Sequence, residues 1–523
     1  MKLKQFTMVA AALATLTVFS QNEHKDWHFK DAKADKVPGI SYAQALTFVE
    51  GKTTKPVIVA VIDGGIDTTH EDLKANLWRN PNEIPGNGID DDYNGYADDI
   101  YGWNFIGGPE GNVELENMEL TRLYREMKQA EKDGSLTSDS KKWQEYTSIK
   151  EAYDLELSEA DEMKTYLEQV AWVYSMCDDL VSKHLGTEEY TMDQVRAIKT
   201  TNEDLRNAQE FFIMTEKEGL KEEDITEGKE HFDKMVDYYL NLDFDPRGIV
   251  GDNPAEISDS LYGNNDVMGG DPSHGTHVAG IIGAVRNNNL GMDGIATNVK
   301  LMTIRVVPDG DERDKDVAMG IRYAVNNGAA VINMSFGKYY SPYSEMVYDA
   351  IAYAEKNGVI MVHAAGNDAS DIDSEPHFPT KAFAENNAEN KFWIEVGASS
   401  SDRKKMLPAN FSNYGQNTVD IFAPGVDIYS CVPGSEYKAM SGTSMAAPVV
   451  TGVVALMLNY YPEMDRAQVK EIIVNAGADY SKKKVYAPAE GGKPVKIKFS
   501  ELSNSGKVLN AAEALKLSSE TLN

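Results

Sequence analysis

Cysteine and positive charge are both scarce in this chain of 523 residues. The two cysteines, Cys177 and Cys431, show no metal-ligand spacing, so a cysteine-based zinc site is excluded; they form either one disulfide or two buried thiols. The 51 lysines and arginines are outnumbered by 83 aspartates and glutamates, which gives a formal net charge of −32. Such a chain repels phosphate backbones, so we expect no nucleic-acid partner, whereas divalent cations suit the charge.

The first twenty residues have the pattern of a secretory signal peptide. Lys2 and Lys4 give a positive start, residues 6–19 are largely apolar and uncharged, and Ser20 suits cleavage after it. The apolar stretch is shorter than the ~20 residues needed to span a bilayer, and we find no second run of that length. We therefore expect an exported protein, secreted or periplasmic, without a transmembrane segment; its oligomeric state is not indicated.

A buried strand follows a polar extension at residues 21–55. Residues 57–62 are apolar without alternation, which is typical of a strand covered on both faces in a parallel sheet. The strand ends at Asp63-Gly64-Gly65, and ligands of open α/β sheets bind beyond such strand ends. Asp63 is therefore either a functional carboxylate or a cap of the following turn. We assign residues 56–109 to the first part of an α/β domain.

Proline is absent between Pro109 and Pro246, and good helix formers dominate this stretch. We expect four to six helices in an acidic all-α insertion at residues 110–247, with a capping box at Thr191 and Gln194 and glycines punctuating the run. The insertion carries no catalytic pattern. Our hypothesis is that it shields a cleft or assists folding.

Alternating strand and helix patterns return over residues 248–523, which we assign to the second part of the same α/β domain. Strands alternating with helices predict βαβ units and a parallel sheet. Strands are expected at residues 299–304, 330–334, 359–362, 393–396 and 419–422, and helices near 316–327, 344–357, 445–460, 466–476 and 510–517.

An acidic stretch between the first strand and the insertion resembles the front half of an EF-hand loop. Asp90, Asp92, Asn94 and Asp98 occupy the oxygen-ligand positions, but Tyr101 stands where the bidentate glutamate belongs. The alternatives are a structural calcium site and a solvated acidic turn. We expect calcium, because carboxylates this close repel one another without a cation.

Three further motifs carry side chains suited to acyl transfer. His274-Gly275-Thr276-His277 opens a helix rich in small residues, and its two histidines could instead be metal ligands. Asn367 follows a strand and could donate to an oxyanion. Ser444, in Gly442-Thr443-Ser444, begins an apolar helix, where a serine is either a nucleophile or an ordinary cap.

Asp63, His274, Asn367 and Ser444, in this order and in these motifs, resemble the subtilisin-like serine proteases (subtilases). The matching text is Ala60–Asp67, His274–Gly280, Ala364–Asn367 and Gly442–Pro448. The resemblance implies a doubly wound parallel α/β sheet interrupted by the all-α insertion, and a serine endopeptidase that needs no cofactor for catalysis. Gly64 departs from the Ser or Thr usual after the catalytic Asp.

The resemblance also implies residue roles. Ser444 would be the nucleophile, His274 the general base, Asp63 its orienting acid, and Asn367 an oxyanion donor. Two short segments would bind polypeptide substrates, with an apolar preference for the residue before the cleaved bond: Ser335, Phe336, Gly337, Ala364, Ala365 and Gly366.

Two other functions remain open from the sequence. One is a catalytically weak binding protein that uses the acidic insertion as its partner surface. The other is a processing protease or peptide ligase on the same scaffold, since an amine can capture an acyl-enzyme as well as water can. The intact set of four site residues favours the exported endopeptidase.

Overall fold

The computed structural model describes residues 25–138, 140–375, 377–382, 389–489 and 494–522. The predicted signal peptide lies outside them. The chain separates into two compact units, the larger comprising residues 25–119 and 245–522 and the smaller, in its described part, residues 120–244.

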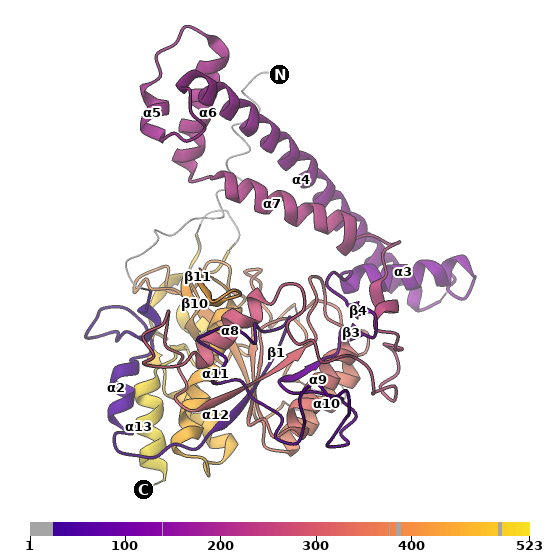
Figure 1. Cartoon of the computed structure of the whole chain (residues 1–523), viewed down its shortest axis with the longest axis vertical. Coiled ribbons are helices and arrows are strands. Elements are labelled where there is room, and N and C mark those ends of the chain that lie inside the picture. The colour runs from indigo at the N-terminus through magenta and orange to yellow at the C-terminus, as the bar shows by residue number, and fades with distance from the viewer. Residues whose placement is uncertain (1–24, 139, 376, 383–388, 490–493, 523) are drawn as a thin grey trace. The chain divides into compact units, whose positions relative to one another are not determined.

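A nine-stranded sheet forms the centre of the larger unit (Figure 1). Its order is β12-β15-β9-β8-β7-β6-β1-β5-β2, and all neighbours are parallel except β12 and β15. The chain moves to one side of β1 for β5 and to the other side for β6, so a topological switch lies at β1. The bounds are β1 Val57–Asp63, β2 Gly102–Asn104, β5 Val299–Arg305, β6 Val331–Met334, β7 Ile360–Ala364, β8 Trp393–Ser399, β9 Ile421–Pro424, β12 Ala478–Asp479 and β15 Lys507–Val508.

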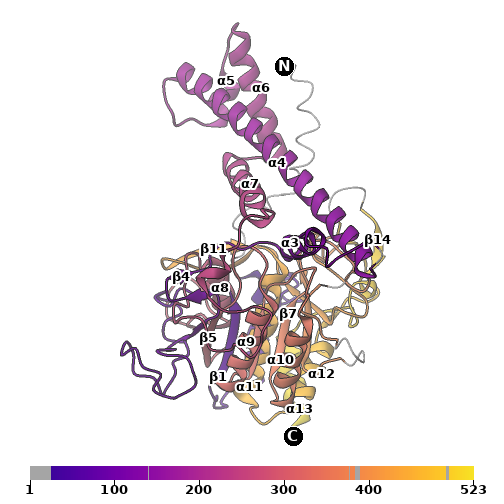
Figure 2. The ribbon, with the colours of Figure 1, turned by 90° about the vertical axis from the view of Figure 1, so that its right-hand side faces the viewer.

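Helices cover both faces of this sheet. Val59 and Val61 of β1 belong to a core with helices α2, α8, α11, α12 and α13, whereas Ala60 and Ile62 belong to a core with α9 and α10. Figure 2 shows α9 and α10 in front of the strands. The predicted doubly wound fold is confirmed. The bounds are α2 Tyr42–Thr47, α8 Ser273–Gly283, α9 Asp314–Asn326, α10 Ser344–Lys356, α11 Thr443–Tyr460, α12 Arg466–Asn475 and α13 Ala511–Thr521.

Three antiparallel hairpins and several short helical turns complete the larger unit. The hairpins are β3 Gly107–Gly108 with β4 Gly111–Asn112, β10 Ile428–Val432 with β11 Glu436–Met440, and β13 Lys484–Tyr486 with β14 Lys496–Lys498. The 3₁₀ turns are Trp27–Phe29, Pro246–Ile249 and Phe499–Glu501.

Helix α11 is, among the described residues, the one helix long and apolar enough to cross a membrane. However, 89% of it is buried inside the fold, where it contacts β6, β7, β8 and β9. Its apolar character is that of a core helix.

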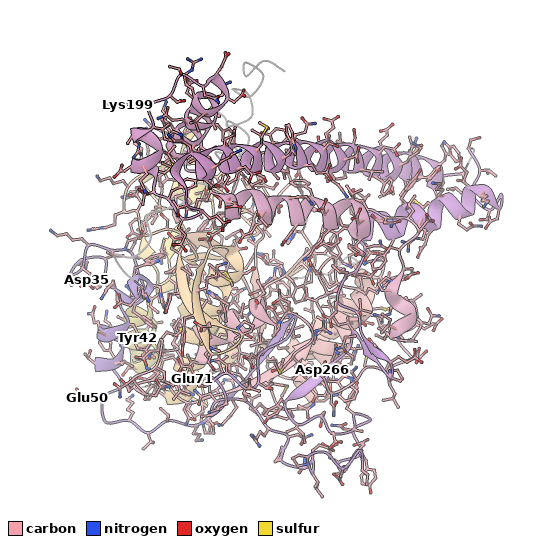
Figure 3. The ribbon with its side chains drawn as sticks, turned by 45° about the horizontal axis from the view of Figure 1, so that its top comes forward. Asp35, Tyr42, Glu50, Glu71, Lys199 and Asp266 are labelled. Carbon is pink, nitrogen blue, oxygen red and sulfur yellow. The ribbon has the colours of Figure 1, made fainter. Side chains whose placement is uncertain are left out.

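The N-terminal extension is built into the larger unit. Trp27 Nε1 donates to the Val426 carbonyl at 2.9 Å, and Tyr42 Oη donates to the Ile295 carbonyl at 2.7 Å. Both side chains are almost fully buried. Figure 3 labels Tyr42 between Asp35 and Glu50 along one side of the unit. The extension therefore contributes to the main core.

The smaller unit is helical. Thr191 and Gln194 form the predicted capping box at α5, and Gly186 and Gly219 end α4 and α6 in left-handed conformations. Gly228 does not punctuate a helix; it lies inside α7, where an added Cβ would be 3.4 Å from Leu167. The bounds are α3 Glu119–Lys132, α4 Lys142–Leu185, α5 Met192–Ala197, α6 Glu203–Glu218, α7 Glu222–Lys234 and a π-helical turn Met235–Tyr239.

The two cysteines are buried and unbonded. Cys177 lies in α4 of the smaller unit and Cys431 in β10 of the larger unit. Burial raises the pKa of the Cys177 thiol to about 11 and also raises that of Cys431. Of the two alternatives left by the sequence, buried thiols are the one observed.

Ion pairs, most of them buried, lie where the chain leaves the larger unit. Lys338 Nζ lies 2.7 Å from Glu119 Oε2 and 2.9 Å from Asp314 Oδ1, and all three side chains are at most 7% exposed. Arg313 pairs with Glu116 at 2.9 Å and with Asp245 at 3.7 Å. Glu116 precedes the smaller unit and Asp245 follows it, so one arginine contacts both flanks of that unit.

A second group of buried charges lies just after the smaller unit. Arg247 pairs with Asp316 at 2.7 Å, and Lys315 pairs with Asp252 at 2.6 Å. These four side chains are at most 7% exposed. Buried charges require such partners, because an uncompensated ion in the interior is costly. The first turn of α9 thus holds the segment through which the chain returns to the larger unit.

Candidate active site

Asp63 and His274 are joined by a hydrogen bond of 2.8 Å between Asp63 Oδ1 and His274 Nδ1. Asp63 is the last residue of β1, and His274 lies in the first turn of α8. A Cβ at Gly275 would lie 2.1 Å from the Gly65 carbonyl. Only glycine therefore lets this helix approach the end of the strand, which explains the glycine of the His motif.

The protonation of His274 is biased by this contact. Burial acts to lower the pKa of His274, but the charge and the hydrogen bond of Asp63 act in the opposite direction, and the net result is a raised pKa. The Asp63 side chain is 3% exposed, whereas that of His274 is 44% exposed. The buried Asp63 carboxylate therefore orients the imidazole from one side, and the other side of the ring is open to solvent, as a proton-transfer group requires.

Ser444 lies in the first turn of α11, next to the end of β6. Its hydroxyl donates to the Ser335 carbonyl at 3.1 Å, and the Ser335 hydroxyl donates to the Ser444 carbonyl at 3.0 Å. The Ser444 carbonyl is open to this bond because Pro448, four residues on, has no N–H to donate. The proline of the serine motif thus helps to attach α11 to β6.

The strand register brings Ser335 beside Asp63. Ile62 of β1 pairs with Met334 of β6, so the next residues, Asp63 and Ser335, leave the sheet side by side. Since the Ser335 carbonyl binds the Ser444 hydroxyl, Asp63, His274 and Ser444 all lie at the carboxyl edge of the sheet.

Asn367 is exposed just beyond β7 and is fixed through its carbonyl oxygen. Asn367 Oδ1 accepts hydrogen bonds from the Thr443 backbone N–H at 2.9 Å and from the Thr443 hydroxyl at 3.0 Å. Holding Oδ1 in this way turns the Nδ2 group away from Thr443. An amide donor is thereby oriented beside the serine turn, where an oxyanion would need it.

The two predicted substrate-binding segments flank the serine turn. One begins at Ser335, and the other is attached by Gly366, whose N–H donates to Thr443 Oγ1 at 3.1 Å. Ala364 and Ala365 are buried, and the Phe336 side chain packs against the core that includes α9 and α10. The alanines therefore offer backbone rather than side chains to a substrate.

The second histidine of the His motif has a different environment. His277 is fully buried and its Nε2 contacts the Lys438 carbonyl at 3.0 Å. Burial lowers the pKa of His277 to about 4. His274 and His277 thus bind different partners, which does not favour the alternative of a two-histidine metal site.

The acidic loop brings three carboxylates together, but not all of those predicted. Oxygens of Glu83, Asp90 and Asp92 lie within 4.8 Å of one another. Asp98 instead accepts hydrogen bonds from the backbone of Gly86 and Gly88, both at 2.7 Å. Three hard oxygen donors fit calcium, and Glu83, which the EF-hand spacing missed, replaces Asp98 in the group.

Asn94 stays with this loop as a bridging group. Its Nδ2 lies 3.3 Å from Asp92 Oδ2 and its backbone N–H donates to Asp90 Oδ1 at 3.1 Å. Asn94 thus contacts two of the three clustered carboxylates, those of Asp90 and Asp92.

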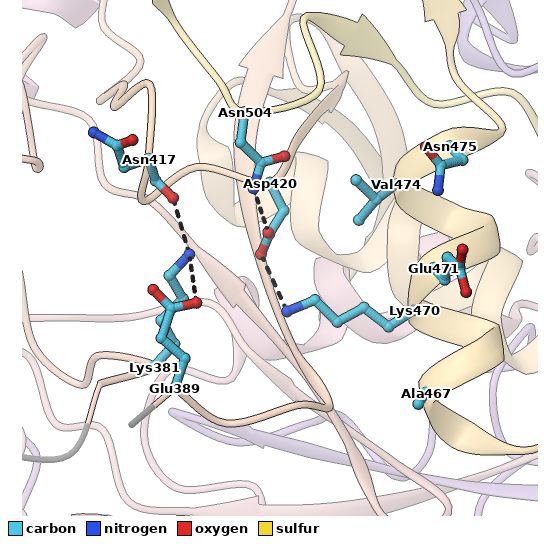
Figure 4. A pocket seen from close by; sticks show the side chains of 10 residues that line it. All are labelled: Lys381, Glu389, Asn417, Asp420, Ala467, Lys470, Glu471, Val474, Asn475 and Asn504. Carbon is cyan, nitrogen blue, oxygen red and sulfur yellow. Dashed lines mark hydrogen bonds and ion pairs between the residues drawn. The ribbon is translucent and has the colours of Figure 1, made fainter. Parts of the chain in front are cut away.

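Two cavities lie away from these residues. One, of about 350 Å³, is shown in Figure 4; its lysines are paired, Lys381 with Glu389 and Lys470 with Asp420. The other, of about 830 Å³, lies beside α13 and contains Lys516, which pairs with Glu513. Neither contains a predicted site residue.

The sheet is that of a doubly wound α/β protein, and the Asp63–His274 pair and the Ser444 turn lie at its carboxyl edge. The pattern of the Subtilase family matches residues 54–492. The chain therefore belongs to the subtilase family of serine-type endopeptidases.

Named relatives align with part of the chain. Thermophilic serine proteinase of Bacillus sp. (strain AK1) is 40% identical over 226 residues, which are 43% of this chain and 50% of that protein. Cell wall-associated protease of Bacillus subtilis (strain 168) is 32% identical over 43% of this chain and 24% of its own length. Subtilisin BL of Lederbergia lenta is 34% identical over 43% of this chain and 80% of its own. The chain thus spans half or less of the first two relatives.

Proposed function

We propose that this protein is an exported serine endopeptidase that hydrolyses polypeptides through an acyl-enzyme. The observation that carries the proposal is the 2.8 Å contact between Asp63 and His274 at the sheet edge where Ser444 is held. Export is supported by the charge and apolarity of the first twenty residues and by the cell wall-associated relative.

The first half of the reaction forms an ester. The Ser444 hydroxyl turns from the Ser335 carbonyl toward His274, gives its proton to Nε2 and attacks the substrate carbonyl carbon. Asp63 keeps the proton of Nδ1 in place and stabilises the imidazolium. The Asn367 amide and the Ser444 N–H, at the positive end of α11, stabilise the oxyanion.

The second half releases both products. His274 passes its proton to the leaving amine as the carbon–nitrogen bond breaks, and then takes a proton from a water molecule that attacks the ester. The acid is released and Ser444 regains its proton.

We also propose that Glu83, Asp90 and Asp92 hold a structural calcium ion. Bound calcium would offset two of the three negative charges of these clustered carboxylates and stiffen the loop. The proposal is supported by their mutual proximity, and catalysis does not require the ion.

A fluorophosphonate probe tests the main proposal directly. The purified mature protein should be labelled, and Ser444→Ala should abolish labelling while leaving the circular dichroism spectrum unchanged. Peptide products analysed by mass spectrometry should carry new free termini, whereas a ligase would give joined peptides. A folded wild type that is neither labelled nor active on peptides would contradict the proposal.

A further inference from the structure

We propose that His363 is a charged positioning residue of this protease: ion-paired with Glu395 inside the sheet, its ring donates to the Phe336 carbonyl and holds the predicted substrate-binding segment 335–337 in place. This inference rests on the proposed function, because it concerns how a polypeptide is bound for cleavage. Neither His363 nor Glu395 takes part in the reaction described above.

The strand register places these groups next to one another. Met334 of β6 pairs with His363 of β7, and His363 pairs in turn with Glu395 of β8. Phe336 lies two residues beyond Met334, just past the end of β6. The side chains of His363 and Glu395 are 1% and 4% exposed, so the contact between them excludes solvent.

The hydrogen bonds of the ring require two ring protons. His363 Nε2 lies 2.9 Å from the Phe336 carbonyl oxygen, and His363 Nδ1 lies 2.9 Å from Glu395 Oε1. A carbonyl oxygen only accepts, so Nε2 carries a hydrogen. The contact between Nδ1 and the carboxylate needs a second hydrogen, and imidazole is a stronger base than a carboxylate. His363 is therefore an imidazolium whose charge is balanced by Glu395.

The contacts of Glu395 agree with an ionised carboxylate. Its second oxygen, Oε2, accepts a hydrogen bond from Trp393 Nε1 at 2.7 Å. Its backbone N–H donates to Asp420 Oδ2 at 2.9 Å, and the Asp420 carboxylate lies 4.0 Å from Lys470. Both carboxylates on this side of the pair thus have a cationic partner, as buried charges require.

The other neighbours of His363 leave room for its charge. The Trp393 ring lies 5.1 Å from the His363 ring, between centroids, and an aromatic ring at this distance can stabilise a cation. The His377 ring lies 6.2 Å away. Burial and, after it, the charge of His363 lower the pKa of His377 to about 4, against the charges of Asp368 and Glu395. His377 is therefore neutral at pH 7 and adds no second positive charge.

The bond from His363 holds the middle of segment 335–337. The first residue of the segment, Ser335, exchanges hydrogen bonds of 3.1 and 3.0 Å with Ser444, and the Phe336 carbonyl, one residue on, accepts from His363. Without this donor the carbonyl would lose its partner and the segment would shift, whereas the bonds to Ser444 would remain. We therefore expect a higher KM with little change in kcat.

Steady-state kinetics on one peptide tests the positioning role. The reference is Glu395→Gln, whose amide donates to Nδ1 of a neutral ring, so that no buried charge is left unpaired when His363 is changed. In this background His363→Phe keeps a ring but loses the donor, and KM should rise about 10-fold while kcat changes less than about threefold. His363→Gln, whose Nε2 can donate to Phe336, should restore most of the binding.

Nitrogen NMR of protein with isotope-labelled histidines tests the charge. The inactive Ser444→Ala form is used, so that the sample does not digest itself, and the signals that disappear in His363→Gln identify His363. At pH 7 both of its ring nitrogens should have the chemical shifts of N–H groups. Glu395→Gln should change one of them to the shift of a nitrogen without hydrogen.

A ring nitrogen without hydrogen in the unchanged His363–Glu395 pair at pH 7 would overturn the charge. Active sites are counted with the fluorophosphonate probe, so that KM and kcat refer to folded enzyme. Equal KM for Glu395→Gln with and without His363→Phe would overturn the positioning role. A wild type that neither reacts with the probe nor cleaves peptides would overturn the proposed function, whereas the NMR spectrum would still decide the state of His363.

Discussion

Lys338 and Glu119 form a buried ion pair of 2.7 Å that links the start of α3 to the end of the predicted substrate-binding segment 335–337. Lys338 directly follows Gly337, and Glu119 is the first residue of α3. Glu312 also contributes, since its carbonyl accepts from Lys338 at 2.8 Å. The segment that contains Gly337 and Lys338 is therefore tied to the residue at which α3 begins.

Replacing Lys338 by Met should destabilise the fold and weaken substrate binding. The carboxylates of Glu119 and Asp314 would remain buried without their cation, a change that costs about 3–5 kcal/mol. We expect lower resistance to urea and a higher KM than in Lys338→Arg, which keeps the charge. A Met variant as stable as the wild type would show that the pair does not hold this segment.

Asn367→Ala should reduce kcat with little change in KM, because the donor acts on charge that develops in the transition state. The expected loss is about 10²–10³-fold, the size known for the corresponding subtilisin residue. Asn367→Asp keeps the shape but removes the N–H donor, so its loss should be as large. Steady-state kinetics measures both, and full activity of Asn367→Asp would exclude the oxyanion role.

The pH dependence of kcat/KM should reflect the raised pKa of His274. His274 must be neutral to accept a proton, so activity should rise with pH through a midpoint above 6.5, its ordinary value. Asp63→Asn removes the charge that raises the pKa, so the midpoint should fall, and the rate should drop about 10⁴-fold. An unchanged midpoint in that variant would contradict the coupling.

The same raised pKa should make the stability of the fold decrease as pH rises, whereas the activity increases. Protonated His274 is favoured in the folded state, so its contribution is fully present below pH 6.5 and is lost as pH rises through the raised pKa. The free energy of unfolding, measured by urea denaturation, should therefore fall more for the wild type than for Asp63→Asn as pH rises from 6.5 through the raised pKa of His274.

Calcium should raise the unfolding temperature if Glu83, Asp90 and Asp92 bind it. At a concentration about 100 times the Kd, the stabilisation would be about 2.7 kcal/mol. Asp90→Asn combined with Asp92→Asn should abolish the response. Asp98→Asn should lower stability but keep the response, because Asp98 binds backbone groups of residues 86–88. Equal melting curves with calcium and with chelator would argue against the site.

The sequence predicted those parts of the site that depend on local patterns. Asp63 ends an apolar run, and Ser444 begins an apolar helix, so strand and helix periodicity places both. Glu83 was missed, because it joins its partners through a loop whose path no periodicity specifies. Glu83 lies seven residues before Asp90, outside the EF-hand spacing.

Arg313 contacts both Glu116 and Asp245, so the chain leaves the larger unit and returns to it at neighbouring points. A segment whose two flanks meet can be lengthened, shortened or exchanged without changing the packing of the larger unit's core. Insertions succeed where chain ends lie close together. The helical unit can therefore diverge on its own evolutionary course, and the same junction offers a place to graft other modules onto a protease.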